Sequence, residues 1–546
     1  MPKRLAITIS GAVSLGSYEA GVLYEIIHAI GQHNTDPATP PANQIKIDVL
    51  TGASAGGMTA TIAAQKLAYE ADALDDPYNN AFYLPWVVDV GIDGLLAMQG
   101  KDDPGRSILS SEYVVDISRR YLTGRYTSHA TPPPKKHAAA ADEIGLGLAM
   151  SNLNGVDYSR ALLLTGNFTY TRHQDELATI IHTAHPADDS LGFWDPLRNA
   201  AVACGAFPFA FKVVDVVRHG VEFDGATPPV APLQPFAYTD GGVFQNEPLG
   251  LAKNLVDEAD EHLGVEDRFY LFVAPGSRSS TSNAEFSAAK ARYVPTAMQL
   301  VSAIFSQARF QDWIKAERMN DQVVLFNAQA LALQRMFLQG SAAVQLQQAE
   351  HFQAAANDLL SALFPDQPVT QPPHEKLEVA RERLKRQFKQ EYEELSSAAG
   401  DAWIDTILAL EKSAALGTRD EMTIFGITAE DRELASYELS AFAGFFDRRF
   451  RDHDYDVGRR KAQEFLAKPG TLGPIRFAPE PIRAIDASLD GLSFENMDQK
   501  LRERVRDALR KQSHAILKAS GLGPALLREA VDFVVVRNVL NAVLKL

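Results

Sequence analysis

Short apolar runs alternate with amphipathic stretches over the first half of the chain. Strand-like runs rich in β-branched and other apolar residues span residues 5–9, 45–50, 161–164 and 268–274. Apolar side chains recur at helical spacing over residues 19–30 and 55–71. Strands that alternate with helices predict an α/β fold, with a mainly parallel sheet sandwiched by helices.

The pattern changes after Gly276. Residues 277–283 read as a polar linker, and helical spacing follows over residues 297–319, 328–363 and 374–399. Prolines within residues 364–373 must interrupt these helices, and residues 468–481 form a second Pro/Gly-rich link. We therefore expect an α/β domain over residues 1–276, a large helical extension over 277–418, and a mostly helical C-terminal region over 419–546.

Composition narrows the possible partners and surroundings. The chain has 546 residues, of which 46% are hydrophobic and 22% charged, as in folded globular proteins. A net charge of −16 argues against nucleic acid as a partner, and membrane contact would need local basic runs such as residues 381–389 or 448–451. Cys204 is the single cysteine, which excludes an intrachain disulfide.

The location follows from the same features. The first residues imitate a secretion signal, but polar residues from Ser10 onwards dilute the apolar run and Glu19 ends it. The chain contains no apolar stretch of about 20 residues that could span a membrane. We expect a cytoplasmic protein, with transient peripheral membrane contact as an option that the basic runs leave open.

The segment from Gly52 to Gly56 has the form G-x-S-x-G and lies between a predicted strand and a predicted helix. In a nucleophile elbow, this context places a serine on a strained turn, with its oxygen exposed at the end of the strand. The helix that follows directs its first N–H groups to the same place. The alternative interpretation of Ser54 is a Gly/Ser-rich turn without catalytic use.

Two further loops could contribute to a functional site. Residues 10–16 are a loop of small residues after the first strand, which can present backbone N–H groups to an anion. The loop matches neither G-x-G-x-x-G nor a P-loop, so no nucleotide cofactor is expected. Asp240, followed by Gly241 and Gly242, is a carboxylate on a tight turn that, taken alone, need be no more than a turn.

Together, these three motifs resemble the patatin-like phospholipases in their order and context. Residues 18–23 and 200–208 support the resemblance, which covers about residues 5–276. Residues 441–460 are also similar to the helical tail of larger bacterial patatin-related proteins.

The resemblance implies a lipid acyl hydrolase of the phospholipase A or lysophospholipase type that forms an acyl-enzyme without metal or cofactor. Ser54 would be the nucleophile and Asp240 the general base. Backbone N–H groups of Gly11, Ala12 and Val13 would form the oxyanion hole. The supporting glycines would be Gly52, Gly56, Gly241 and Gly242. The loop departs from the family pattern, because Ala12 and Val13 replace glycines and Leu15 replaces a basic residue.

Two other functions stay open from the sequence. An α/β-hydrolase-type esterase would need a triad histidine, for which the candidates are His262, His351, His374, His453 and His514. A non-catalytic patatin-like scaffold is the second alternative. The sequence leaves the lipid class and the oligomeric state undetermined.

The helical extension offers a candidate cover for the active site. Met298, Val301, Ile304, Phe305 and Ala308 recur at helical spacing and form an apolar face within residues 297–319. Because a lipid ester needs an apolar channel beside Ser54, we expect this helix to pack over that end of the sheet.

Overall fold

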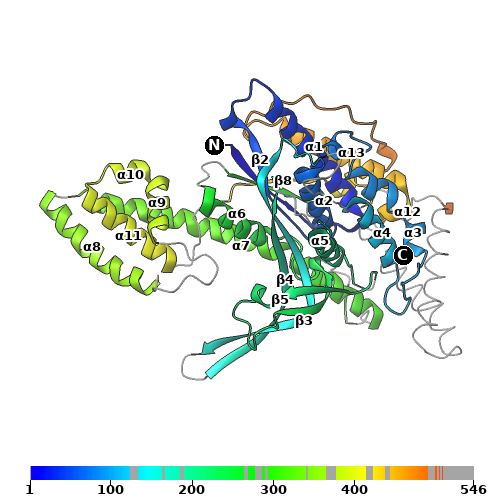
Figure 1. The fold of residues 1–546 in the computed structure, drawn as a ribbon, viewed down its shortest axis with the longest axis horizontal. Helices are drawn as coiled ribbons and strands as arrows, with labels where there is room; N and C mark the ends of the chain where they lie inside the picture. The colour runs from blue at the N-terminus through cyan, green and yellow to red at the C-terminus, as the bar shows by residue number, and fades with distance from the viewer. Residues whose placement is uncertain are drawn as a thin grey trace. The chain divides into compact units, whose positions relative to one another are not determined.

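The fold is described from a computed structural model of the chain (Figure 1). The structure describes residues 2–122, 133–162, 166–184, 190–208, 210–263, 268–276, 286–288, 293–339, 342–363, 377–413, 422–436, 443–489, 499–500, 503 and 507. The chain forms two compact units. One contains residues 1–256, 266–313 and 424–546, and the other contains residues 257–265 and 314–423. The predicted three-part division of the chain stays a proposal.

An eight-stranded sheet forms the centre of the first unit, in the order β5-β6-β3-β2-β1-β7-β8, with β4 paired to β3. Its strands are β1 (Lys3–Ile9), β2 (Ile45–Gly52), β3 (Ala140–Leu162), β4 (Gly166–His182), β5 (Val214–His219), β6 (Leu233–Asp240), β7 (Arg268–Val273) and β8 (Ile424–Ile427). The run β3-β2-β1-β7-β8 is parallel, whereas β4 and β6 pair antiparallel with β3. The predicted α/β class with a mainly parallel sheet is confirmed.

Helices cover both faces of this sheet (Figure 1). Helix α1 (Gly16–Thr35) connects β1 to β2, and α2 (Ala55–Tyr69) follows β2. Helix α2 packs against both α1 and α5 (Ser190–Cys204). Right-handed crossovers place α1 and α2 on the same face. Helix α6 (Leu249–Leu263) packs Leu251 and Leu255 against Gly145 and Gly147 of β3, on the opposite face from the buried Leu146 and Leu148.

The C-terminal part of the chain belongs to the same core. Helix α13 (Arg448–Leu466) packs along α1, and the two backbones touch where glycines face each other. A Cβ atom on Gly21 would lie 2.1 Å from the carbonyl oxygen of Tyr455, and one on Gly458 would lie 2.1 Å from that of Tyr18. Only glycine permits this approach, so the α1–α13 seam depends on both residues.

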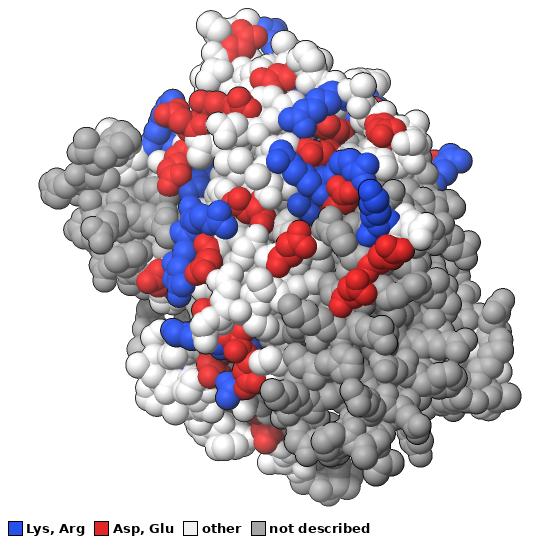
Figure 2. All heavy atoms as spheres, turned by 90° about the vertical axis from the view of Figure 1, so that its right-hand side faces the viewer, with Lys and Arg blue, Asp and Glu red and all other residues white. Residues whose placement is uncertain are grey.

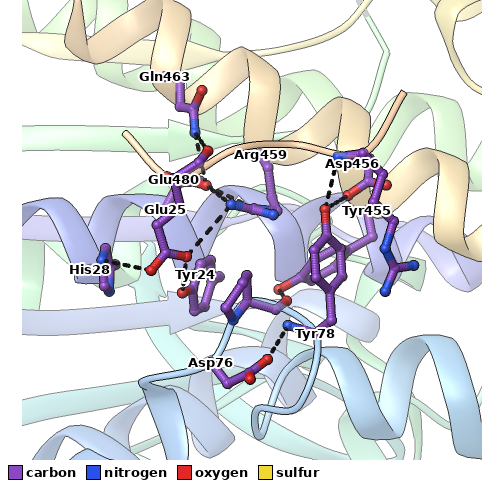
Figure 3. A network of polar contacts seen from close by, with 12 residues as sticks. Tyr24, Glu25, His28, Asp76, Tyr78, Tyr455, Asp456, Arg459, Gln463 and Glu480 are labelled. Carbon is purple, nitrogen blue, oxygen red and sulfur yellow. Dashed lines mark hydrogen bonds and ion pairs between the residues drawn. The ribbon is translucent and has the colours of Figure 1, made fainter. Parts of the chain in front are cut away.

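A buried ion pair completes the α1–α13 seam (Figure 3). The Arg459 Nη2 atom lies 2.6 Å from Glu25 Oε1, and both side chains are almost fully buried. The guanidinium also lies over the rings of Tyr24 and Tyr78, at 5.3 and 5.1 Å from their centroids. Removing one partner of such a pair would leave an uncompensated buried charge, which typically costs about 3–5 kcal/mol.

The second unit is helical. It contains the end of α7 (Tyr293–Phe337), then α8 (Ala342–Leu363), α9 (Leu377–Gln387), α10 (Lys389–Glu393) and α11 (Ser397–Ser413). Trp403 of α11 is fully buried at its centre and donates its indole N–H to the carbonyl oxygen of Ala330 at 3.0 Å. The ring of Phe388 meets Trp403 edge to face, with 5.5 Å between centroids.

Most predicted elements of the first half are confirmed, and several of the second half differ. Of the strand predicted at 161–164, residues 161 and 162 are the end of the long strand β3, and residues 163 and 164 lie outside the described residues. The helix predicted over 328–363 is divided, since α7 ends at Phe337 and α8 begins at Ala342. The helix predicted over 374–399 is divided among α9, α10 and α11, and the region from 419 begins with β8. The predicted linker at 277–283 lies outside the described residues.

Both basic runs are paired with acidic side chains. In residues 381–389, Arg381 contacts Asp405 and Lys385 contacts Asp401. In residues 448–451, Arg448 lies 3.4 Å from Asp452, and Arg449 is likewise paired with Asp447. Figure 2 shows the same interspersion of basic and acidic side chains on the face that lies at the right of Figure 1.

Among the described residues, no helix is long and apolar enough to cross a membrane. The same residues contain no cluster of histidine, cysteine, aspartate and glutamate side chains suited to a metal ion.

The close approach at Gly458 gives the first prediction. Gly458→Ala should lower the free energy of unfolding by about 3 kcal/mol, because the new Cβ meets a backbone carbonyl that cannot move independently of α1. Gly100→Ala is the matched control, since a Cβ there meets nothing within 4 Å. Urea denaturation of both variants measures the difference. Equal stability of the two variants would contradict the α1–α13 seam.

Candidate active site

Ser54 lies on a strained turn between β2 and α2. Its backbone has φ 52° and ψ −128°, a region that non-glycine residues rarely adopt. A Cβ on Gly52 would lie 2.4 Å from the backbone of Gly56, and one on Gly56 would lie 2.4 Å from the carbonyl oxygen of Ser10. The two glycines of the G-x-S-x-G motif therefore allow the turn to close against the end of β1.

Asp240 lies at the end of β6, where its side chain meets Ser54. Ser54 Oγ donates to Asp240 Oδ2 at 2.6 Å, and the N–H of Gly242 donates to Asp240 Oδ1 at 2.7 Å. The main chain of Asp240 is fixed by bonds to Ala206 and Ser151. Gly241 is required next to it, because a Cβ there would lie 2.0 Å from the carbonyl oxygen of Ala149. The structure thus brings the two predicted side chains into direct contact.

The carboxyl group of Asp240 is fully buried, and this burial raises its pKa from 3.8 to about 7. The hydrogen bonds from Ser54 and Gly242 act in the opposite direction, because they stabilise the charged form. Among the described residues, no cation faces this carboxylate. Its basicity is therefore set chiefly by desolvation, and its proton affinity falls in the range useful for a general base at neutral pH.

The loop after β1 approaches Ser54 from the other side. A Cβ on Gly11 would lie 3.1 Å from the Cβ of Ser54. The N–H of Gly11 donates to the carbonyl oxygen of Asn246 at 3.0 Å, so this predicted oxyanion donor is already engaged. Within the described part of the chain, the N–H groups of Ala12 and Val13 have no protein partner. They are the donors of this loop that a ligand can use.

Val13 has the other strained backbone of the site, with φ 53°. A β-branched residue in this region costs of order 1–3 kcal/mol where glycine would cost nothing. The chain tolerates this strain at the loop beside Ser54, where the sequence shows valine instead of glycine.

An apolar cavity of about 790 Å³ of empty volume, which includes its open mouth, begins at Ser54. The following residues line it: Val13, Ser54, Ala55, Met58, Ile62, Pro85, Trp86, Val90, Leu95, Val114, Ile117, Ser118, Tyr121, Leu122, Gly205, Phe207, Phe211 and Phe445. Its walls come from α2, from the π-helical turn Leu84–Asp89, from α4 (Ser111–Tyr121) and from α12 (Ala443–Phe446). A cavity this apolar suits a hydrocarbon chain better than a polar group.

Comparison with known proteins agrees with this geometry. A family model described as patatin-like phospholipase matches residues 7–253, which contain Ser54, Asp240 and the loop after β1. This part of the chain belongs to the patatin-like phospholipase family.

A second comparison extends beyond the patatin-like domain. The uncharacterized protein y4iI of Sinorhizobium fredii (strain NBRC 101917 / NGR234) is 23% identical over 499 residues. The similarity covers 86% of this chain and 65% of that protein, so the chain spans less than two thirds of its relative's length. The similarity therefore extends beyond residues 7–253 and into the helical half of the chain.

The predicted triad histidines are absent from the described surroundings of Ser54. His453 is bound to the carbonyl oxygen of Glu433 at 2.9 Å, and His351 to that of Gln347. The side chains of His262, His374 and His514 lie outside the described residues. In the described part of the patatin-like domain, the hydroxyl of Ser54 meets a carboxylate directly and no imidazole lies between them.

The predicted cover helix lies within α7, but the described lining of the cavity comes from other elements. Ile304 of the predicted apolar face is 46% exposed, and the side chain of Phe305 lies outside the described residues. The described apolar walls of the cavity include three segments that the sequence analysis did not connect with the site, namely the π-helical turn, α4 and α12.

Asn246 is a further site residue, which the sequence analysis did not connect with Ser54. The backbone carbonyl of Asn246 accepts the N–H of Gly11, and its side-chain amide donates to the carbonyl oxygen of Gly11 at 3.4 Å. A Cβ on Gly11 would lie 2.2 Å from Asn246 Oδ1, so the two residues are in tight contact. Asn246 therefore positions the loop against Ser54. The sequence signal that could have identified it is its place shortly after Asp240.

The buried carboxyl group gives the second prediction. The pKa of an aspartate is 3.8 in the unfolded chain and about 7 at Asp240 in the folded protein. Between these pH values the folded protein binds a proton that the unfolded chain has lost, so the free energy of unfolding falls as pH rises. Asp240→Asn removes this ionisation. Relative to wild type, the variant should therefore gain on the order of 3 kcal/mol between about pH 4 and pH 8. Urea denaturation at both pH values measures the change. A stability difference independent of pH would contradict the raised pKa.

Proposed function

We propose that this protein is a serine acyl hydrolase that cleaves lipid esters, with Ser54 as nucleophile and Asp240 as general base. The observation that carries the proposal is the bond of 2.6 Å from Ser54 Oγ to the buried carboxylate of Asp240, beside an apolar cavity that Ser54 lines. Membership of residues 7–253 in the patatin-like phospholipase family supports the same class of reaction.

In the first step, Ser54 Oγ attacks the carbonyl carbon of the ester while Asp240 Oδ2 accepts the hydroxyl proton. Direct contact between the two groups makes a relay through histidine unnecessary. The desolvated carboxylate is a stronger base than one in water, because its charged form is poorly stabilised by the surroundings. Collapse of the tetrahedral intermediate expels the alcohol, which takes the proton from Asp240 and leaves an acyl-enzyme.

In the second step, water attacks the acyl-enzyme, and Asp240 accepts the proton of that water. When the intermediate collapses, this proton returns to Ser54 Oγ and the fatty acid is released. In both steps, a negative charge develops on the carbonyl oxygen. The N–H groups of Ala12 and Val13, which lack protein partners among the described residues, would stabilise that charge. The first peptide groups of α2 would add the positive end of the helix dipole.

Substitution of the dyad tests the proposal. Ser54→Ala and Asp240→Asn should each lower kcat/KM for a p-nitrophenyl ester by about 10³-fold or more, because neither group has a substitute and the pair acts as a unit. Ser488→Ala, at an exposed serine, is the control and should retain activity. A fluorophosphonate probe should label wild type at Ser54, as located by mass spectrometry. Full activity of Ser54→Ala would reject the proposal.

The pKa of Asp240 predicts the pH dependence. Since the base must be deprotonated, kcat/KM should fall about tenfold per pH unit below pH 7 and level off above it. The measurement is the initial rate with a substrate that does not itself titrate between about pH 5 and pH 9. A constant rate across the lower part of this range would mean that a group other than Asp240 accepts the proton.

A further inference from the structure

We propose that the C-terminal segment of residues 443–451 is a built-in wall of the acyl-binding cavity, in which Phe445 determines the length of acyl chain accepted and Arg451 is a positioning residue. This inference rests on the proposed function, because it concerns the substrate of the same site.

Phe445 lies almost 400 positions after Ser54 in the sequence, yet it lines the same cavity. Its ring is 6% exposed and packs in one apolar cluster with Val90, Leu95 and Ile117, which line that cavity too. These neighbours belong to the patatin-like domain, whereas Phe445 lies outside the matched residues 7–253. The size of the side chain at position 445 therefore limits the space that an acyl chain can occupy.

The backbone beside Phe445 is attached to the loop that faces Ser54. The N–H of Gly444 donates to Ser14 Oγ at 3.1 Å, directly after the strained Val13. A Cβ on Gly444 would lie 2.6 Å from the hydroxyl oxygens of both Ser14 and Ser436. Glycine is thus needed for α12 to approach the loop, and the wall and the loop are fixed to each other.

Arg451 connects two walls of the cavity from behind. Its Nε donates to the carbonyl oxygen of Val87 in the π-helical turn at 3.0 Å, and its Nη1 donates to that of Gly444 at 2.5 Å. The side chain is 4% exposed, and burial lowers its pKa to about 10, so it stays charged at neutral pH. The planar fork of arginine donates in several directions at once, which a lysine ammonium at the same place could not reproduce.

Helix α13 holds this assembly against the patatin-like domain. Arg451 lies near its N-terminal end, and Gly458 and Arg459 further along it form the α1–α13 seam. Asp454, between them, accepts the backbone N–H groups of Ala435 and Ser436. Hydrogen bonds join Gly444 to Ser14 and Arg451 to Val87. These bonds define the position of the wall independently of any substrate.

The test compares acyl chain length preference in variants of adjacent phenylalanines. Phe445→Ala should enlarge the cavity and raise the ratio of long-chain to short-chain kcat/KM at least about tenfold. Phe445→Leu is a milder variant if alanine prevents folding, and should shift the ratio in the same direction. Phe446→Ala is the matched control, because Phe446 is also buried and adjacent but is not among the lining residues. Its preference should equal that of wild type.

Arg451→Lys tests the positioning role, since it keeps the charge but not the fork of donors. It should raise KM for the preferred chain length several-fold, with a smaller change in kcat, and flatten the chain length preference. A fall in kcat alone, with the preference unchanged, would contradict this role.

A second readout separates failure of the inference from failure of the proposed function. Saturated fatty acids of increasing length are titrated against Ser54→Ala, alone and combined with Phe445→Ala, and thermal stabilisation is recorded. Here too, the combined variant should prefer longer chains. If wild type cleaves no ester and no probe labels Ser54, the proposed function fails, but fatty acid binding still decides the inference. Identical chain length preferences with phenylalanine and alanine at position 445 would overturn it.

Discussion

The α1–α13 seam is the constraint on which the site depends, because it fixes two segments of the active site from the two ends of the chain. Helix α1 begins at Gly16, directly after the loop that faces Ser54. Helix α13 begins at Arg448, directly after the segment that carries Phe445. Backbone contact at Gly21 and Gly458 leaves no room for sliding, and the buried pair of Glu25 and Arg459 adds a penalty for separation. One helix pair thus sets the distance between the loop after β1 and the cavity wall.

The centre of the site could be predicted from the sequence because its chemistry is local. A serine on a strand-to-helix turn needs flanking glycines, and a carboxylate at the end of a strand needs a tight turn, so both leave short motifs around Ser54 and Asp240. Phe445 and Arg451 leave no such motif, and Asn246 is marked only by its place shortly after Asp240. Their roles come from contacts with residues far away in the sequence, and a single chain carries no local sign of that pairing.

The fold shows the same division between local and long-range information. The parallel strands next to β1 have compact apolar runs and were predicted, whereas the antiparallel β4, β5 and β6 were not. In β5, buried and exposed positions alternate over only six residues, from Val214 to His219, which is too short a pattern to distinguish from a loop. Strand β8 is shorter still, and its pairing with β7 depends on residues about 150 positions earlier. The cover helix stays a prediction, since an apolar face does not specify what it packs against.

Asp240 differs from Asp48 and Asp175, two other buried carboxylates on strands of the sheet, in what faces it. Asp48 is paired with Arg268, and Asp175 with Arg218, so each charge is neutralised where it is buried. Asp240 instead meets a hydroxyl and one peptide N–H, which stabilise an anion less than a guanidinium does. A cation in that position would stabilise the fold near neutral pH but would also lower the pKa of Asp240 and weaken it as the proposed base. The domain therefore carries a stability cost at Asp240 and strained backbone at Ser54 and Val13, and such costs concentrate where the chemistry requires them.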